Sequence, residues 1–202
     1  MDLKIFIVLF CALFTGGNSL QCYKCSGIMG CGQSNVTTCP GTAACAATVQ
    51  SIDGLKMQSK GCGVTESCIS GSVNLGVTRT VTSTQCCTTD LCNNKDPPDS
   101  SSNSPNGKQC YYCNDDTSCF NKLNCLGDED RCLTETVTVG SVSVTVKGCV
   151  SKSICDAASQ SQAPEDYTRL SCCQGNLCNG AKSVTQNLLF LLWPLFFFIL
   201  IH

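Results

Sequence analysis

Cysteine is the residue type that offers most chemistry in this sequence, with 21 among 202 residues. Two Cys-x2-Cys pairs, Cys22–Cys25 and Cys110–Cys113, have a spacing that zinc sites use. The alternative is a set of disulfides, which such a cysteine content indicates in a chain made in an oxidising compartment. We favour disulfides because the one histidine, His202, lies in a C-terminal segment that we expect to be removed. We therefore expect no metal, no cofactor and no Cys–His or Ser–His catalysis.

Carboxylates are the other residues that could catalyse a reaction, and they occur in two short runs. These are Asp115-Asp116 and Asp128-Glu129-Asp130. A catalytic pair needs two carboxylates facing each other across a cleft, whereas short acidic runs are usually solvated loops. We favour solvated loops, and we interpret the protein as not an enzyme. The net charge of −2 and the lack of a basic stripe also argue against a nucleic-acid partner.

The cysteines are arranged as one unit that occurs twice. The first set of ten is Cys22, Cys25, Cys31, Cys39, Cys45, Cys62, Cys68, Cys86, Cys87 and Cys92. The second set is Cys110, Cys113, Cys119, Cys125, Cys132, Cys149, Cys155, Cys172, Cys173 and Cys178. The intervals between successive cysteines are 2, 5, 7, 5, 16, 5, 17, 0 and 4 residues in the first set, and 2, 5, 5, 6, 16, 5, 16, 0 and 4 in the second. This agreement indicates two tandem homologous domains, which we place at residues 20–93 and 109–179.

The segment between the two units, residues 94–108, is rich in proline, serine and asparagine and contains no large apolar residue. Such a composition is typical of a flexible linker. We therefore expect two domains that need not share a fixed interface.

Both ends of the chain resemble processing signals. An apolar run follows Lys4 and is too short to span a membrane, so we expect a cleaved signal peptide over residues 1–19. At the other end, three small residues precede a polar spacer and an apolar tail of 14 residues. This order is typical of a glycosylphosphatidylinositol (GPI) attachment signal, with residues 180–202 removed and attachment at Asn179 or Gly180.

The long intervals between cysteines read as β-hairpins. Asp53-Gly54 is a strong two-residue turn signal between two strand-like segments. In the second unit, valines alternate with Thr and Ser residues on either side of Gly140-Ser141, which is the period of a strand. A further β-branched segment covers residues 77–84, and no clear helical periodicity appears between the two processing signals.

The cysteine pattern resembles the lymphocyte-antigen-6/urokinase-receptor family, whose members consist of three-finger (LU) domains. The resemblance rests on Leu20-Gln21-Cys22-Tyr23-Lys24-Cys25 at the start of the first unit and on Cys-Cys-x4-Cys-Asn at the end of each unit. It implies an all-β fold with three fingers per domain. Spacing alone leaves the disulfide connectivity open. The resemblance implies the pairs Cys22–Cys45, Cys25–Cys31, Cys39–Cys62, Cys68–Cys86 and Cys87–Cys92, and then Cys110–Cys132, Cys113–Cys119, Cys125–Cys149, Cys155–Cys172 and Cys173–Cys178.

The function that we predict is recognition at the outer face of the plasma membrane. We expect a GPI-anchored surface glycoprotein that binds an extracellular protein ligand through its finger loops; the alternative is an inhibitor of a secreted phospholipase or protease. Asn35 is the glycosylation candidate, because Asn35-Val36-Thr37 is a conventional sequon. The candidate ligand contacts are exposed apolar residues of the central fingers: Ile52, Leu55, Met57, Val139 and Val142. Packing of these residues between fingers is an equally good reading.

Overall fold

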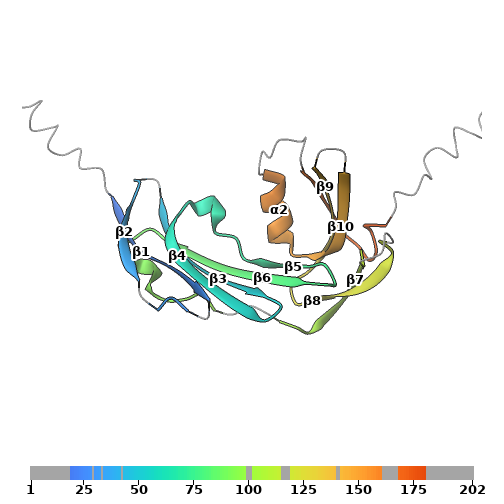
Figure 1. The fold of residues 1–202 in the computed structure, drawn as a ribbon, viewed down its shortest axis with the longest axis horizontal. Coiled ribbons are helices and arrows are strands. Elements are labelled where there is room, and N and C mark those ends of the chain that lie inside the picture. Colours follow the sequence, from blue (N-terminus) through green and yellow to red (C-terminus); the bar gives the residue numbers. More distant parts are fainter. Residues whose placement is uncertain are drawn as a thin grey trace, which may run out of the picture.

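The computed structural model describes residues 19–28, 30–32, 34–41, 43–98, 102–114, 119–139, 142–160 and 168–180. The predicted signal peptide and the apolar tail lie outside these residues. Within them the chain forms eleven β-strands, two 3-10 helices and one α-helix (Figure 1). The predicted all-β fold class is confirmed.

The first domain consists of three hairpins, which are its three fingers. Strands β1 (Leu20–Ile28) and β2 (Asn35–Cys39) form the first, β3 (Ala44–Ile52) and β4 (Leu55–Gly63) the second, and β5 (Gly71–Asn74) and β6 (Arg79–Cys87) the third. A 3-10 helix, η1 (Thr65–Ser67), follows β4, and another, η2 (Cys92–Asn94), ends the domain. The predicted turn is confirmed, because Ile52 pairs with Leu55 and both Asp53 and Gly54 have positive φ.

The second domain repeats the first two hairpins and departs from the third. Strands β7 (Pro105–Tyr112) and β8 (Asn121–Leu126) pair with each other, as do β9 (Arg131–Val139) and β10 (Val142–Val150). An α-helix, α2 (Lys152–Gln160), then precedes β11 (Thr168–Cys173), which pairs with β9. Strand β7 begins at Pro105, within the segment predicted to be a linker.

Helix α2 was not predicted, because the sequence shows no clear helical periodicity between the processing signals. It has only nine residues, and Cys155 is its single buried side chain. Its partly or fully buried residues, Ile154, Cys155, Ala157 and Ala158, lie on one face. Nine residues make only about two and a half turns, which is too short for a clear helical period in the sequence. The disulfide between Cys155 and Cys172 fixes it against β11.

Ten disulfides join the described cysteines, five in each domain. They are Cys22–Cys45, Cys25–Cys31, Cys39–Cys62, Cys68–Cys86, Cys87–Cys92, Cys110–Cys132, Cys113–Cys119, Cys125–Cys149, Cys155–Cys172 and Cys173–Cys178. These are the pairs that the family resemblance implies. Cysteines also make up the buried clusters at the base of each domain. A covalent core of this kind compensates for the small apolar surface that a short domain can bury.

Each domain closes in the same way at its base, through an asparagine that follows the last cysteine. The buried Asn93 side chain accepts a hydrogen bond from the Tyr23 amide at 3.0 Å and donates to the Tyr23 and Ala46 carbonyls, both at 2.9 Å. In the second domain, Asn179 makes the equivalent three bonds to Tyr111 and Leu133. This asparagine therefore ties the end of each unit to its first and third strands.

The two domains share one sheet, contrary to our expectation that they need no fixed interface. The strand order is β11-β9-β10-β5-β6-β3-β4-β1-β2, so the domains meet where β5 pairs with β10. Helix α2 lies over β5 at this junction (Figure 1). Pairing between strands far apart in the sequence has no local signal, so the sequence could not predict it.

Candidate ligand-binding surface

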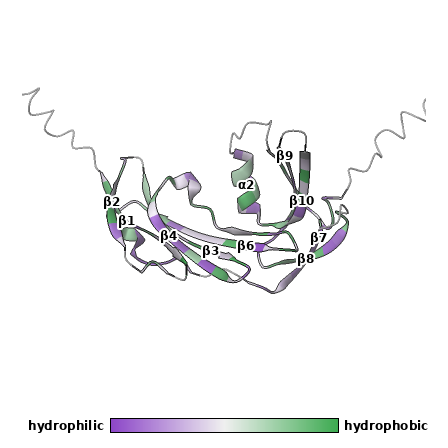
Figure 2. Cartoon of the chain, viewed as in Figure 1, coloured by the Kyte–Doolittle hydropathy of each residue, from purple (hydrophilic) through white to green (hydrophobic). Residues whose placement is uncertain are grey.

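The central finger of the first domain carries the most prominent exposed apolar residues among the predicted contacts. Leu55 is 50% exposed and Met57 is 38% exposed, both on β4. They point to the same face because side chains two residues apart on a strand share a face. Ile52, which pairs with Leu55 across the turn, is half-buried. Hydrophobic and hydrophilic stretches alternate along β3 and β4 (Figure 2).

Ile28 belongs to the same patch and was missed in the sequence. It is 65% exposed and pairs directly with Met57 where the end of β1 runs beside β4. Residues opposite each other in an antiparallel pair have neighbouring side chains on one face. Ile28, Leu55 and Met57 therefore form one exposed apolar patch, which we call the finger patch. Only the register of β1 against β4 places Ile28 there, and the sequence does not encode that register locally.

The tip of this finger is tied to the third finger by Asp53. Its carboxylate accepts hydrogen bonds from the Arg79 amide and the Thr78 hydroxyl, both at 2.8 Å. The Asp53 amide in turn donates to the Arg79 carbonyl at 3.0 Å. The amide of Arg79, and then the hydroxyl of Thr78, lower the pKa of the exposed Asp53 carboxyl below its ordinary value. These bonds fix the orientation of the finger patch relative to the rest of the sheet.

The central finger of the second domain is less apolar in the residues that the structure describes. Val139 and Val142 pair with each other at its tip, as the predicted hairpin requires. Val144, farther along β10, is 57% exposed. Beside β10, the exposed Phe120 ring packs edge-on against the Tyr111 ring, with 6.1 Å between the ring centres. The Lys147 Nζ atom lies 5.5 Å from the centre of the Phe120 ring. The predicted contacts of the two domains thus lie on separate fingers.

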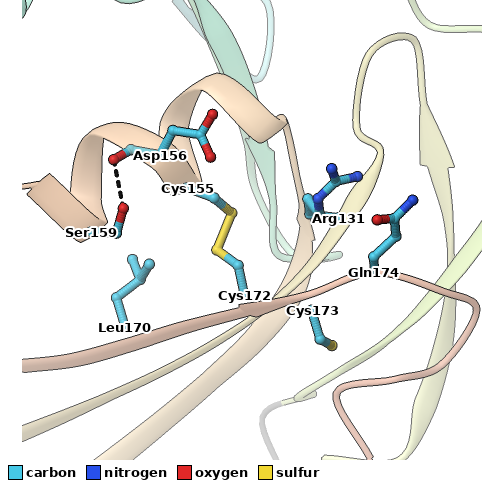
Figure 3. Close-up of a pocket in the computed structure, with 8 residues that line it drawn as sticks. All are labelled: Arg131, Cys155, Asp156, Ser159, Leu170, Cys172, Cys173 and Gln174. Atoms are coloured by element: carbon cyan, nitrogen blue, oxygen red, sulfur yellow. Dashed lines mark hydrogen bonds between the residues drawn. A yellow bond between two sulfur atoms is a disulfide. The ribbon is translucent and has the colours of Figure 1, made fainter.

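A pocket of about 360 Å³ lies between α2 and β11 in the second domain (Figure 3). Ser159 and Leu170 line one end, Arg131 and Gln174 the other, and the Cys155–Cys172 disulfide lies between them. Its charged and hydroxyl groups already have partners. Arg131 bonds Asp130 at 2.7 Å, and Ser159 donates to the Asp156 carbonyl at 2.7 Å. Asp156 itself pairs with Lys152. These groups stabilise the helix and the strand ends, and the arrangement lacks an activated nucleophile.

The cysteine clusters that are compact enough to hold a metal consist of disulfide-bonded residues. Two groups of three cysteine sulfur atoms lie within 4.8 Å of one another, namely Cys22, Cys39 and Cys62, and Cys110, Cys125 and Cys149. All six are in disulfides, and a disulfide sulfur is not the thiolate that binds zinc. The prediction of solvated acidic loops is wrong for Glu129, whose side chain is fully buried. Asp115 and Asp116 lie outside the described residues.

The predicted modification sites differ in exposure. Asn35 is exposed on β2, which is an edge strand of the nine-stranded sheet. Asn179 is 4% exposed and uses its side-chain amide inside the domain, whereas Gly180 follows it at the end of the described chain. Within the same part of the chain, no helix has the length and apolar character needed to cross a membrane.

Two family models match the chain at successive positions. The u-PAR/Ly-6 domain matches residues 18–95, and the snake toxin and toxin-like protein family matches residues 108–179. The chain belongs to the lymphocyte-antigen-6/urokinase-receptor family of three-finger domains. The family predicted from the cysteine pattern is therefore confirmed.

Relatives with similar sequences include urokinase plasminogen activator surface receptors. The mouse protein is 31% identical over 132 residues, and the rat protein is 32% identical over 131 residues. Each alignment covers 60% of this chain and 40% of the relative, so the chain spans about two fifths of the length of these receptors. Among solved structures, mouse TEX101 aligns with 78% of this chain and 99% of its own, at 17% identity and a TM-score of 0.30.

Proposed function

We propose that this protein is a GPI-anchored cell-surface recognition protein, without enzymatic activity, that binds an extracellular protein through the finger patch of its first domain. The observation that supports this most is the exposure of Ile28, Leu55 and Met57 side by side on one face. Contiguous exposed apolar side chains mark interaction sites more often than isolated ones do. The similar surface receptors support a receptor role.

The finger patch is held rigidly at both ends, which favours a role in ligand binding. The central finger is held at its base by Cys39–Cys62 and Cys22–Cys45, and at its tip by the Asp53 bonds to the third finger. A surface fixed at both ends loses little conformational freedom when a partner binds, and this preorganisation increases affinity. We therefore place the ligand on this finger rather than on the pocket beside α2.

The proposed GPI anchor rests on the small residues, polar spacer and apolar tail of residues 179–202. The burial of Asn179 helps to choose between the two candidate attachment residues. Attachment at Asn179 would draw this residue into the processing enzyme, although its amide holds Tyr111 and Leu133 through three hydrogen bonds. Attachment at Gly180 leaves those bonds intact. We therefore choose Gly180, with the domain base directly above the outer leaflet.

A glycan at Asn35 would lie on the first finger, at the border of the finger patch. Asn35 pairs with Lys24, which is four residues before Ile28 on β1. At about 3.4 Å per residue, the two positions are about 14 Å apart along the strand. A glycan there would restrict approach from the β2 edge and leave the β3–β4 side open.

The test is binding of the soluble ectodomain to cells that display the ligand. Leu55→Ser and Met57→Ser together should reduce cell binding at least about tenfold, because loss of apolar anchors from the centre of an interface typically costs more than 1 kcal/mol. The matched control is Val64→Ser, which removes another exposed apolar side chain of the same domain, 51% exposed and outside the patch. Equal binding by the double variant and the control would refute the finger patch as the site.

A further inference from the structure

The junction between the domains begins with a very short strand pairing. Val73 and Asn74 of β5 pair with Val150 and Cys149 of β10. The side chains of Val73 and Leu75 also pack against Leu133, Val150 and Cys155 of the second domain. A ladder this short provides few hydrogen bonds, so other contacts must determine whether the domains stay together.

A buried carboxylate of the second domain supplies the strongest of these contacts. The Glu129 side chain is fully buried, and its Oε1 accepts a hydrogen bond from Arg79 Nε of the first domain at 2.6 Å. Its Oε2 accepts from Asn74 Nδ2 of the first domain at 3.3 Å and from the Leu126 amide at 2.8 Å. A buried charge is tolerated only with partners of this kind, and two of the three come from the other domain.

Arg79 extends the same contact to the segment that joins the domains. Its side chain is 15% exposed, and its Nη1 and Nη2 donate to Asn103 Oδ1 at 2.7 Å and to the Ser102 carbonyl at 3.1 Å. The guanidinium thus binds Glu129 and the residues just before β7 together. Arginine suits this role because its planar group presents several donors in fixed directions.

A second group of polar contacts lies beside the first. The buried Ser72 of β5 donates from its amide to Ser151 Oγ at 2.7 Å and from its hydroxyl to Asp128 at 3.0 Å. The Ser151 amide returns a bond to the Ser72 carbonyl at 2.9 Å. Ser153 at the start of α2 donates to the Ser70 carbonyl at 2.6 Å. Five residues at the domain boundary are therefore joined by hydrogen bonds between the domains, and the two central ones, Ser72 and Ser151, are buried.

Three glycines let the two domains approach this closely. A Cβ added at Gly148 would collide with the backbone of Asn74, and one at Gly76 would collide with the Tyr112 ring. A Cβ at Gly71 would lie 2.9 Å from Ile154 of α2. Each of these positions faces the opposite domain, so the absence of a side chain is needed on both sides of the junction.

From these contacts we infer that the two domains form one rigid body held by an interdomain latch, which we define as Glu129, Arg79, Asn74 and the Ser72–Ser151 pair. None of the ten disulfides joins the two domains, so apart from the polypeptide chain itself only noncovalent contacts hold them together. The segment between the domains, residues 94–104, keeps each domain at a high effective concentration relative to the other. The latch then sets the orientation of one domain relative to the other.

The test cuts the joining segment and asks whether the halves separate. The full-length protein carries a protease site in place of residues 99–101 and is cleaved after purification. On a non-reducing denaturing gel, two fragments should appear. By native size-exclusion chromatography, the same fragments should elute together.

Glu129→Ala should increase the dissociation constant of the cleaved fragments by at least about a hundredfold, because it leaves Arg79 partly buried without its carboxylate. The matched control is Asp156→Ala, which removes an exposed carboxylate of the same domain that is paired only within α2 and should leave co-elution unchanged. Arg79→Gln tests the same contact from the first domain and keeps the second domain's sequence intact. The inference is overturned if the wild-type fragments separate while each remains folded, or if both latch variants co-elute like the wild type.

Discussion

Asn93→Ala is the substitution that tests most sharply how the domain base is held. The Asn93 side chain is 2% exposed and makes three hydrogen bonds with the Tyr23 amide, the Tyr23 carbonyl and the Ala46 carbonyl. Alanine removes all three and leaves backbone groups of β1 and β3 without partners. The disulfides and the strand pairs stay in place, so the effect isolates this side chain.

The expected loss follows from the three bonds. A net contribution of about 1 kcal/mol for each bond, and a larger cost where a backbone group stays buried and unpaired, gives about 3–5 kcal/mol in the free energy of unfolding. This is a large fraction of the roughly 5–15 kcal/mol typical of a whole domain. Asn94→Ala is the matched control, because Asn94 is exposed and follows directly in the chain.

Hydrogen exchange with the disulfides intact measures this loss in the first domain, with the second domain as an internal reference. Amides of β1 and β3 that exchange through global unfolding should exchange at least about a hundredfold faster in Asn93→Ala, since each 1.4 kcal/mol is a factor of ten. Amides of β9 should stay within a few fold of wild type. Exchange of β1 and β3 within twofold of wild type would show that the disulfides alone hold the base.

Three further predictions concern the finger, the disulfides and the anchor. Because the Asp53 carboxyl has a lowered pKa, its stabilising contribution is present at neutral pH and is lost as pH falls through that lowered value. Asp53→Asn should therefore abolish this acid-dependent decrease in the unfolding temperature. An unchanged decrease in the variant would assign it to another group. Cys62→Ser and Cys149→Ser each open a disulfide that contributes about 3 kcal/mol in the chain-entropy model. Both substitutions should therefore reduce surface display relative to total expression. Normal display together with unchanged protease resistance would show that these disulfides are dispensable. Phosphatidylinositol-specific phospholipase C should release the protein from cells with a C-terminal peptide ending at Gly180; a mature peptide containing Trp193 would refute the anchor.

Local signals in the sequence were sufficient for the hairpins and for the duplication. Asp53-Gly54 predicts its turn because both residues tolerate positive φ, and the alternating valines predict β9 and β10 because a strand repeats every two residues. The disulfide pairs came from the family resemblance, because spacing alone allows many connectivities. Leu55 and Met57 were chosen from the sequence as apolar residues near a turn, and the structure shows that both are exposed.

Features that depend on contact between distant segments were not predictable. Ile28 joins the finger patch only through its register with Met57, and two of the three hydrogen-bond donors to the buried Glu129 carboxylate come from the other domain. An acidic run in a sequence usually indicates solvent exposure, and in this chain Arg79, 50 residues away, reverses that expectation. Helix α2 was missed because its nine residues make only about two and a half turns, too few for its apolar residues to show a clear helical period.

Site-specific crosslinking from the finger patch is the measurement that tests the proposed recognition most directly. A photoreactive residue at Met57, and in a separate protein at Val64, would be placed in the soluble ectodomain, which is then bound to ligand-displaying cells and irradiated. We predict that position 57 crosslinks to one extracellular protein, that Leu55→Ser in the same protein abolishes the product, and that position 64 gives none. Equal products from positions 57 and 64, or a product at 57 that survives Leu55→Ser, would contradict recognition through the finger patch.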